Sequence, residues 1–379
     1  MNILFFTQIS PFPVTRGERI RSYGLLKALS NSGHTVHAII GNEDKISFND
    51  FNIKNVIFYE QSPKVFRKID NLFGVSYFKK DNNLIDVFDN VLLKSSIKLA
   101  FLDYAFIGQY IKYFKNQGIP VIYGTHNSQS NLSWQKPVDG IYKKVIKFQR
   151  KLFQNFHERY YFNRADIIIV VSEKDKDFHS NFVSPKKLKV IPNFLDENRY
   201  LNNYLKEDYF VMTANFSAYM NAEGLKWFIT NVWDEELDAK IKFKVVGQNS
   251  IQALSQIEAS KKFLNIEAVG SVKEIYPYIG KAQGVIVPLL QGSGSRLKCL
   301  EAMALKTTIV STNKGVEGLN SEGFYVCNTP EEFKSVLLNF EVNDIKADIA
   351  YVDFLENYSL KSAVHSMNAT LKELLGVSQ

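Results

Sequence analysis

The residue types best suited to binding chemistry gather in one glycine-rich stretch between a predicted strand and a predicted helix. The stretch consists of Gly292, Ser293, Gly294 and Ser295. Small residues let a backbone approach a ligand closely, and the unpaired N–H groups at the start of a helix can bind an anion. The pattern therefore indicates a site for an anionic group such as a phosphate.

Three charged residues follow in the predicted helix. Arg296 and Lys298 lie in its first turn, where the helix dipole disfavours cations, so an anionic ligand such as a diphosphate should offset the cost. Glu301 lies about one turn further, and a carboxylate there can accept hydrogen bonds from two ribose hydroxyls. Together these residues favour a nucleotide-diphosphate site over the alternative, an ordinary glycine-rich connection with solvated side chains.

A second candidate, His126, follows the predicted strand Val121–Gly124. Ligands of α/β sheets bind at the carboxyl ends of the strands, so we favour a binding or catalytic role for His126 over a structural cap. Glu158 has two interpretations that the sequence leaves open: a solvated partner of Arg159, or a residue of the same site.

Metal chemistry is not indicated. The sequence has two cysteines, no H-E-x-x-H motif and no Cys/His cluster. Asp175 and Asp177 have the spacing of a metal-binding pair, but their place after a predicted strand favours the start of a helix, where acidic charge is stabilising. We therefore expect no metal site and no cofactor.

These residues are positioned by an alternation of predicted strands and helices. The predicted strands are 3–7, 35–40, 56–59, 99–102, 121–124, 166–172, 189–191, 209–213, 242–246, 266–269, 284–288 and 308–311, and the predicted helices are 19–32, 141–162, 224–232, 297–305 and 360–375. Such an alternation predicts parallel sheets covered by helices on both faces.

The alternation breaks near Pro192–Asp196. We therefore predict an α/β fold of two tandem Rossmann-like domains facing a cleft, with boundaries 1–195 and 196–379. Ligands should bind in the cleft, at the carboxyl ends of the strands. The final helix, 360–375, is a candidate to cross back to the first domain.

The composition is that of a folded soluble protein. The chain has 379 residues, of which 45% are hydrophobic and 22% charged, which excludes a disordered chain, a collagen and a coiled-coil rod. No apolar run approaches the roughly 18 residues of a spanning helix, and the first residues lack the pattern of a signal peptide. We expect a cytoplasmic protein.

The positive charge is concentrated in the first half. Residues 1–195 hold 28 Lys and Arg against 16 Asp and Glu, whereas residues 196–379 hold 18 against 23. Basic and aromatic residues interleave in Lys64–Lys80 and Lys136–Arg164. Two interpretations stay open: a face that binds an anionic membrane surface, or an aromatic core with solvated lysines. Nucleic acid is not expected as a partner, because no recognised nucleic-acid motif is present.

Several stretches match, in order and spacing, the motifs of one family. They are the first loop Pro11–Arg21, Gly33–Val36 ("GH-V"), the histidine loop Thr125–Asn127, Val171–Asp175 ("VS--D"), Val190–Asn193 ("VIPN"), Val245–Gly247, Asn221–Phe228 ("N-EGL-WF"), Arg296–Ala304 ("R-K--EAMA") and Thr312–Leu319. Over nearly its whole length the chain therefore resembles the two-domain glycosyltransferases with the GT-B fold, of the family 4 type.

The resemblance implies transfer of a sugar, with retention, from a nucleotide-sugar donor to a glycan or lipid-linked acceptor. The donor would be held mainly by the second domain and the acceptor by the first, in the synthesis of a surface polysaccharide such as lipopolysaccharide or capsule, or of a glycolipid. The expected enzyme is a metal-independent hexosyltransferase. The candidate catalytic residues are His126, Arg296 and Lys298; the donor contacts are Gly17, Asn215, Gly247, Gly292, Ser293, Gly294, Ser295 and Glu301; and the acceptor contacts are Arg16, Arg21 and Asn127.

The chain departs from the family pattern at two places. Ser293 stands where the family usually has a glutamate that contacts the donor sugar. The loop 213–223 lacks the basic residues with which the family often holds the diphosphate, so we infer that Arg296 and Lys298 supply that charge.

Two alternatives to a glycosyltransferase remain. A nucleotide-sugar 2-epimerase shares the fold but needs acid/base carboxylates in the first domain, and the sequence shows no convincing pair. The other alternative is a GT-B protein that binds its ligand without catalysis.

Overall fold

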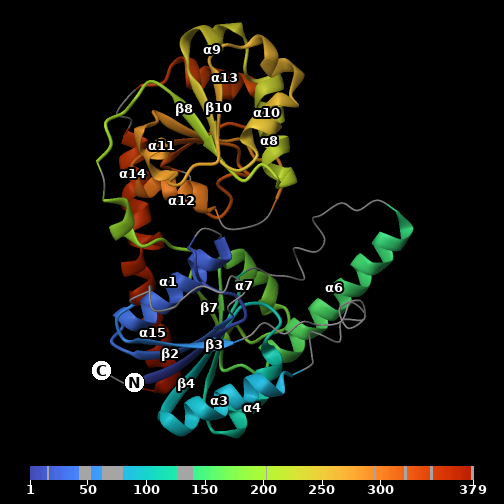
Figure 1. Ribbon diagram of the computed structural model, residues 1–379, viewed down its shortest axis with the longest axis vertical. Helices are drawn as coiled ribbons and strands as arrows, with labels where there is room; N and C mark the ends of the chain where they lie inside the picture. Colours follow the sequence, from blue (N-terminus) through green and yellow to red (C-terminus); the bar gives the residue numbers. More distant parts are fainter. Residues whose placement is uncertain are drawn as a thin grey trace. The chain divides into compact units, whose positions relative to one another are not determined.

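The computed structural model describes residues 1–14, 17–41, 53–61, 80–126, 140–201, 203–292, 296–319, 322–341 and 345–376. The chain forms two compact units (Figure 1). The first unit comprises Met1–Asn193 and Leu360–Gln379, and the second comprises Phe194–Ser359. The chain thus leaves the first unit two residues before the boundary expected from the sequence, and its last segment belongs to that unit.

The first unit is built on a seven-stranded parallel sheet in the order β3-β2-β1-β4-β5-β6-β7. The strands are β1 (Asn2–Thr7), β2 (Thr35–Gly41), β3 (Val56–Gln61), β4 (Ile97–Asp103), β5 (Val121–Gly124), β6 (Ile167–Val170) and β7 (Leu188–Val190). In the interior strand β1, residues 3–6 are all fully buried, because helices cover both faces of the sheet.

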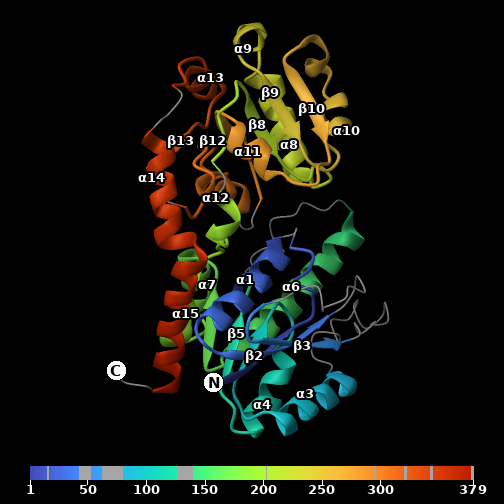
Figure 2. The ribbon, with the colours of Figure 1, turned by 60° about the vertical axis from the view of Figure 1, so that its left-hand side comes forward.

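Among the described residues, six helices flank this sheet. They are α1 (Gly17–Asn31), α3 (Asn82–Lys94), α4 (Ile111–Asn116), α6 (Ile141–Phe162), α7 (Glu173–Ser180) and α15 (Leu360–Leu375). Apolar side chains of α3, α4 and the end of α6 share one cluster with β1, β4 and β5. The last helix, α15, packs beside α1 (Figure 2), and Glu373 on α15 pairs with Lys189 on β7 at 2.6 Å.

The second unit has a six-stranded parallel sheet in the order β10-β9-β8-β11-β12-β13. Its strands are β8 (Phe210–Thr213), β9 (Phe243–Val246), β10 (Ile266–Gly270), β11 (Gly284–Val287), β12 (Thr308–Ser311) and β13 (Phe324–Val326). Its helices are α8 (Tyr219–Asn231), α9 (Glu235–Lys240), α10 (Ser250–Ser255), α11 (Tyr276–Lys281), α12 (Leu297–Ala304), α13 (Pro330–Leu338) and α14 (Ile345–Asp353). Two parallel sheets with flanking helices confirm the predicted α/β fold of two Rossmann-like domains.

Candidate functional site

Arg296 lies directly before α12, and its side chain is only 9% exposed. Its Nη2 donates a hydrogen bond to Oε2 of Glu317 over 3.1 Å. Its Nε is buried and has no hydrogen-bond partner among the described residues. Burial lowers the pKa of this guanidinium, and the Glu317 carboxylate opposes the shift. Because a buried donor without a partner costs about 1–3 kcal/mol, the Nε is suited to an incoming ligand oxygen.

Lys298, in the first turn of α12, is held by a different neighbour. Its Nζ donates to Oδ1 of Asn221, on α8, over 2.7 Å. Burial lowers the pKa of Lys298 to about 8, while the Glu301 carboxylate opposes and Arg296 reinforces this shift. Lys298 is therefore mostly protonated at pH 7, and two cations lie at the start of α12.

Glu301 lies one turn further along α12 and is half-buried. Burial raises the pKa of its carboxyl group to about 7, with Lys298 and Arg199 opposing the shift. Near neutral pH the group is thus close to its titration point. Hydroxyl donors from a ligand would stabilise its ionised form.

Two of the predicted glycines have backbone conformations that favour glycine. Gly292 has φ +116°, and a Cβ placed there would lie 2.7 Å from Sδ of Met220. Gly247 has φ +128°, and a Cβ there would lie 2.1 Å from the carbonyl oxygen of Ala214. A side chain at either position is therefore strained.

The remaining predicted donor contacts have mixed outcomes. Asn215 is exposed after β8, and its Oδ1 accepts a hydrogen bond from the backbone N–H of Ser217 over 2.9 Å. Gly17 begins α1 in the first unit. The predicted contacts Ser293, Gly294, Ser295, Arg16 and Asn127 lie outside the described residues.

In the first unit, His126 lies just after β5 and is buried. Its Nε2 is 3.0 Å from Oδ1 of Asp103, at the end of β4. The other oxygen of Asp103 accepts a hydrogen bond from Oγ of Ser22, on α1, over 2.5 Å. Since an ionised carboxylate only accepts, the Nε2 of His126 carries the proton. In the neutral imidazole, Nδ1 is then the acceptor, and it has no partner among the described residues.

Arg21 lies inside the first unit rather than on its surface, with 2% of its area exposed. It donates to the carbonyl oxygens of Thr125, Ile191 and Pro192, each over 3.1 Å. Burial lowers its pKa to about 10, and the carboxylates of Asp103 and Asp175 oppose the shift. These bonds give Arg21 the role of tying the end of β5 to the segment after β7. They do not support the predicted contact with an acceptor.

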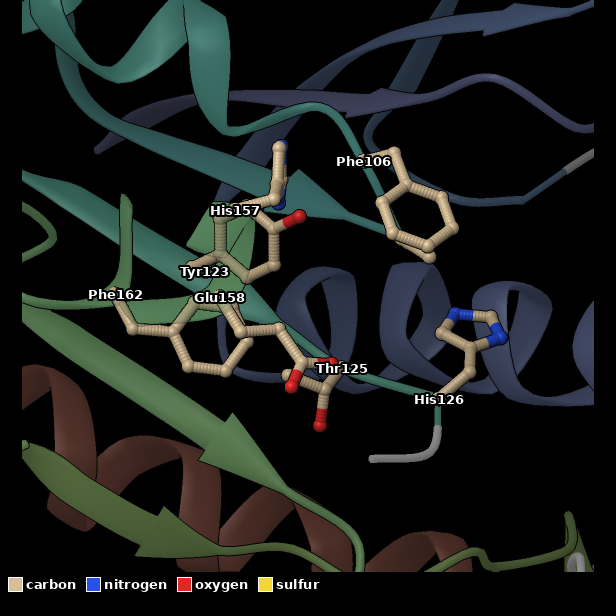
Figure 3. A pocket seen from close by; sticks show the side chains of 8 residues that line it. Phe106, Tyr123, Thr125, His126, His157, Glu158 and Phe162 are labelled. Atoms are coloured by element: carbon tan, nitrogen blue, oxygen red, sulfur yellow. The ribbon is translucent and has the colours of Figure 1, made fainter. Parts of the chain in front are cut away.

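A small pocket lies beside His126 (Figure 3). Its lining comprises Ala105, Phe106, Tyr123, Thr125, His126, His157, Glu158 and Phe162. Glu158 is 3% exposed, and it lines this pocket together with Thr125 and His126. The sequence left two interpretations of Glu158 open. Its burial favours a residue of the pocket over a solvated partner of Arg159.

The backbone directly after Asp103 is strained. Tyr104 has φ 114° and Phe106 has φ 63°, values that non-glycine residues rarely adopt. The ring of Tyr104 packs edge-on against the His126 imidazole, with centroids 5.1 Å apart. Such strain gathers at binding and catalytic sites, and here it adjoins both His126 and the pocket.

Helix α6 carries a row of exposed apolar side chains, which we call the α6 stripe. The stripe consists of Ile141, Val145, Phe148, Leu152, Phe156 and Tyr160, and each is at least 40% exposed. Lys144, Lys147, Arg150, Lys151 and Arg159 lie on the same helix. The interpretation as an aromatic core is therefore wrong for the three aromatic residues of the stripe, although the next two residues, Tyr161 and Phe162, are buried. Residues 136–139 and all of Lys64–Lys80 except Lys80 lie outside the described part of the chain.

Sequence reasoning did not identify four residues that hold the candidate side chains: Ser22, Asp103, Asn221 and Glu317. Asp103 had a usable signal, since it is a lone carboxylate at the carboxyl end of an apolar strand, just as His126 follows the next strand along the chain. Asn221 and Glu317 lie within motifs of the family, but the sequence did not suggest a role for either side chain. Ser22 had no signal, because it lies inside a helix.

Neither a metal cluster nor a spanning helix is found in the described ranges. There, no three His, Cys, Asp or Glu side chains are grouped as a metal ion requires. No helix of the described residues is both long and apolar enough to cross a membrane. Asp175 instead lies in the first turn of α7, where its N–H donates to the Ser172 side chain.

Comparison with protein families gives two consecutive matches. The model described as Glycosyltransferase Family 4 matches residues 19–199, and the model described as Glycosyl transferases group 1 matches residues 207–340. An uncharacterized 44.6 kDa protein in the cps region of Klebsiella pneumoniae is 24% identical over 94% of this chain and 96% of its own length.

Solved structures share the fold at low sequence identity. Sucrose-phosphate synthase from Thermosynechococcus elongatus has a TM-score of 0.74, with 14% identity and complete coverage of both chains. Anabaena HepE in complex with UDP has a TM-score of 0.63 at 13% identity, covering 98% of this chain and 100% of its own. WaaG, a glycosyltransferase involved in lipopolysaccharide biosynthesis, has a TM-score of 0.65 at 12% identity, covering 99% and 100%.

Proposed function

Because the chain belongs to the GT-B glycosyltransferases of the family 4 type, we propose that it transfers a sugar from a nucleotide-sugar donor to a glycan or lipid-linked acceptor, with retention at the anomeric carbon. The observation that carries this proposal is the arrangement at the start of α12. Two cations, Arg296 and Lys298, lie at the start of α12, and the carboxyl group of Glu301 follows one turn further along the same helix, which matches the charges of a diphosphate and the hydroxyls of a ribose.

In this proposal the donor's diphosphate binds Arg296 and Lys298. The buried Nε of Arg296 gains an oxygen acceptor, and the Lys298 ammonium adds a second positive charge. Glu301 accepts hydrogen bonds from the ribose. The UDP complex of Anabaena HepE supports a nucleoside diphosphate as the ligand class, because that protein shares the fold.

The chemical step needs stabilisation of the leaving diphosphate. The bond from the anomeric carbon to the diphosphate oxygen breaks, and a bond to the acceptor oxygen forms. The acceptor's hydroxyl proton passes to the leaving diphosphate. Arg296 and Lys298 stabilise the charge that develops there, so we propose that no metal ion is required.

His126 is proposed to accept a hydrogen bond from a donor sugar hydroxyl. Its Nδ1 is the bare acceptor of the ring, because Asp103 holds the proton on Nε2. The strained backbone of Tyr104 and Phe106 next to it supports a working site at this edge of the first sheet.

We further propose that the acceptor belongs to surface polysaccharide or glycolipid synthesis in the cytoplasm. The related protein of the Klebsiella pneumoniae cps region and the lipopolysaccharide enzyme WaaG support this class of product. The α6 stripe, with its flanking basic residues, is suited to an anionic membrane surface, where a lipid-linked acceptor would reside.

A thermal-shift screen against UDP, GDP, dTDP and CMP tests the donor site. A nucleotide at 100 times its dissociation constant stabilises a protein by about 2.7 kcal/mol. We expect one nucleotide to raise the melting temperature, and Arg296→Ala and Glu301→Ala to abolish the shift. The matched control Glu258→Gln removes an exposed carboxylate of the second unit and should show the same increase in melting temperature as the wild type.

The sugar conjugate of the selected nucleotide then tests transfer. Radiolabelled sugar should appear on a glycan or lipid acceptor in a membrane extract. Release of a free epimerised sugar would instead indicate an epimerase. No stabilisation by any of the four nucleotides would contradict the donor site.

A further inference from the structure

Two recognised motifs, Asn221–Phe228 and Thr312–Leu319, have no task in the proposed chemistry. The structure places one side chain from each motif on one of the two cations: Asn221 on Lys298, and Glu317 on Arg296. Both contacts lie within the second unit. They therefore link the motifs to the diphosphate site.

The amide of Asn221 has a defined orientation. Its Nδ2 donates to the backbone oxygen of Asn215 over 2.8 Å, so its Oδ1 faces Nζ of Lys298 at 2.7 Å. The preceding residue, Met220, packs so close to Gly292 that a Cβ there would lie 2.7 Å from its sulfur. The start of α8 thus contacts Gly292 through Met220 and Lys298 of α12 through Asn221.

The Thr312–Leu319 loop is anchored on two sides. Its Gly315 N–H donates to Oγ1 of Thr312 over 3.1 Å. The Cys299 thiol, on α12, donates to the Gly315 oxygen over 3.5 Å. A Cβ on Gly315 would lie 2.7 Å from the carbonyl oxygen of Val287, at the end of β11. Glu317 is therefore presented to Arg296 from a loop that is fixed to both the sheet and α12.

The charges of this cluster favour orientation of Arg296 over its neutralisation. Oε2 of Glu317 accepts from Nζ of Lys314 at 2.6 Å as well as from Arg296. Two cations thus share one carboxylate, so the three side chains together keep a net positive charge. Asn221 is neutral, so it leaves the charge of Lys298 intact.

We propose that Asn221 and Glu317 are positioning residues that hold Lys298 and Arg296 in place for the diphosphate of the donor. This inference rests on the proposed function. Holding the two cations before the donor binds avoids the entropic cost of ordering two long side chains at that moment.

The test compares ligands that differ only in the group these cations contact. Isothermal titration is carried out with inorganic diphosphate, and with the mono- and diphosphate of the nucleoside that stabilises the wild type. The variants are Asn221→Ala, Glu317→Ala and Glu317→Gln. Two matched controls are Asn231→Ala, which removes an exposed amide on the same helix, and Glu258→Gln, which removes an exposed carboxylate of the same unit.

We expect Asn221→Ala and Glu317→Ala to lower the affinity for inorganic diphosphate and for the nucleoside diphosphate about tenfold, corresponding to roughly 1.4 kcal/mol. The affinity for the nucleoside monophosphate should fall less, so the diphosphate-to-monophosphate affinity ratio decreases. Glu317→Gln keeps an acceptor and should retain most of the affinity. Both controls should leave the ratio unchanged.

Two outcomes would overturn the inference. An unchanged diphosphate-to-monophosphate affinity ratio in variants that still melt cooperatively, including an equal loss of affinity for both ligands, would show that the contacts are only structural. Tighter diphosphate binding by Glu317→Ala would show that Glu317 competes with the ligand. If the wild type binds none of these ligands, the proposed function itself fails, which is a distinct result.

Discussion

The Nε2–H of His126 donates to a carboxylate oxygen of Asp103 over 3.0 Å, and Asp103 is completely buried. The second carboxylate oxygen is occupied by the Ser22 hydroxyl. Two strands and one helix therefore meet in this contact, since Asp103 ends β4, His126 follows β5 and Ser22 lies on α1. The arrangement fixes both the rotation of the imidazole ring and the nitrogen that carries its proton.

We expect Asp103→Asn to disturb this tautomer. An amide nitrogen facing the ring would make Nε2 an acceptor and move the proton to Nδ1, where it could no longer accept from a sugar hydroxyl. Loss of a charge-assisted hydrogen bond costs about 1.5–3 kcal/mol, so kcat/KM should fall roughly 10- to 100-fold. Nitrogen-15 shifts of labelled histidine report the tautomer directly, with His126→Gln to assign the signal. A wild-type His126 protonated at Nδ1 would contradict this account.

All the strands of both sheets except β13 could be predicted, because their apolar runs are long enough to be buried on both faces. Residues 121–124 and 308–311, for example, are strands with the predicted bounds. Helix α13 was missed, although Thr329 and Glu332 form a capping box at its start and Pro330 occupies its first turn. Its apolar pattern is short, so only the capping signal could have revealed it.

The site was predictable only as far as each residue carries its own signal. Arg296, Lys298 and Glu301 were identified because charge at a helix start is locally unusual. Asn221 is 77 residues from its partner Lys298, and Glu317 is 21 residues from its partner Arg296. Only the folded sheet brings these pairs together. Arg21 illustrates the reverse case, because an arginine in a loop motif gives no sign that it will be buried among carbonyl groups.

Nucleoside diphosphate affinity should depend on pH through Lys298 and Glu301. Burial lowers the pKa of Lys298 to about 8, so its positive charge, and with it affinity, should decline as pH rises above that value. Burial raises the pKa of Glu301 to about 7, so the carboxylate that accepts from the ribose should be lost as pH falls below it. Affinity should therefore be highest between about pH 7 and 8.

Titration calorimetry from pH 6 to 9.5 measures this profile. Lys298→Arg keeps a cation that does not titrate in this range, so its affinity should no longer decline above pH 8. Glu258→Gln serves as the control and should retain the wild-type profile. If the affinity of Lys298→Arg still declines above pH 8, Lys298 is not the origin of that decline.

Binding to anionic vesicles should depend on the α6 stripe. Phe148→Glu and Leu152→Glu each place a negative charge among exposed apolar side chains, which removes apolar contact and repels anionic lipid. We expect at least a tenfold loss of binding to vesicles containing 30% or so of phosphatidylglycerol, measured by co-sedimentation. Leu264→Glu is the matched control, because Leu264 is also highly exposed but lies in the second unit. Equal binding by all three variants and the wild type would contradict a membrane role for α6.

Acid should destabilise the first unit through His179. This residue is fully buried against Phe162, Phe178 and Phe182, and neither ring nitrogen has a hydrogen-bond partner among the described residues. Burial lowers its pKa from 6.5 to about 4. The unfolded chain therefore binds a proton between these values that the folded chain does not, so stability falls as pH falls below 6.5.

The free energy of unfolding should drop by about 2 kcal/mol between pH 7.5 and pH 5 through this one group. Urea unfolding at the two pH values measures the change, followed by a probe in the first unit. His179→Leu removes the titrating ring while filling a similar volume. Its free energy of unfolding should therefore fall less on acidification than that of the wild type, by this amount. His157, whose pKa burial lowers to about 3, remains in both proteins and supplies an internal reference. An identical acid loss in the variant and the wild type would mean that His179 is not buried as a neutral ring.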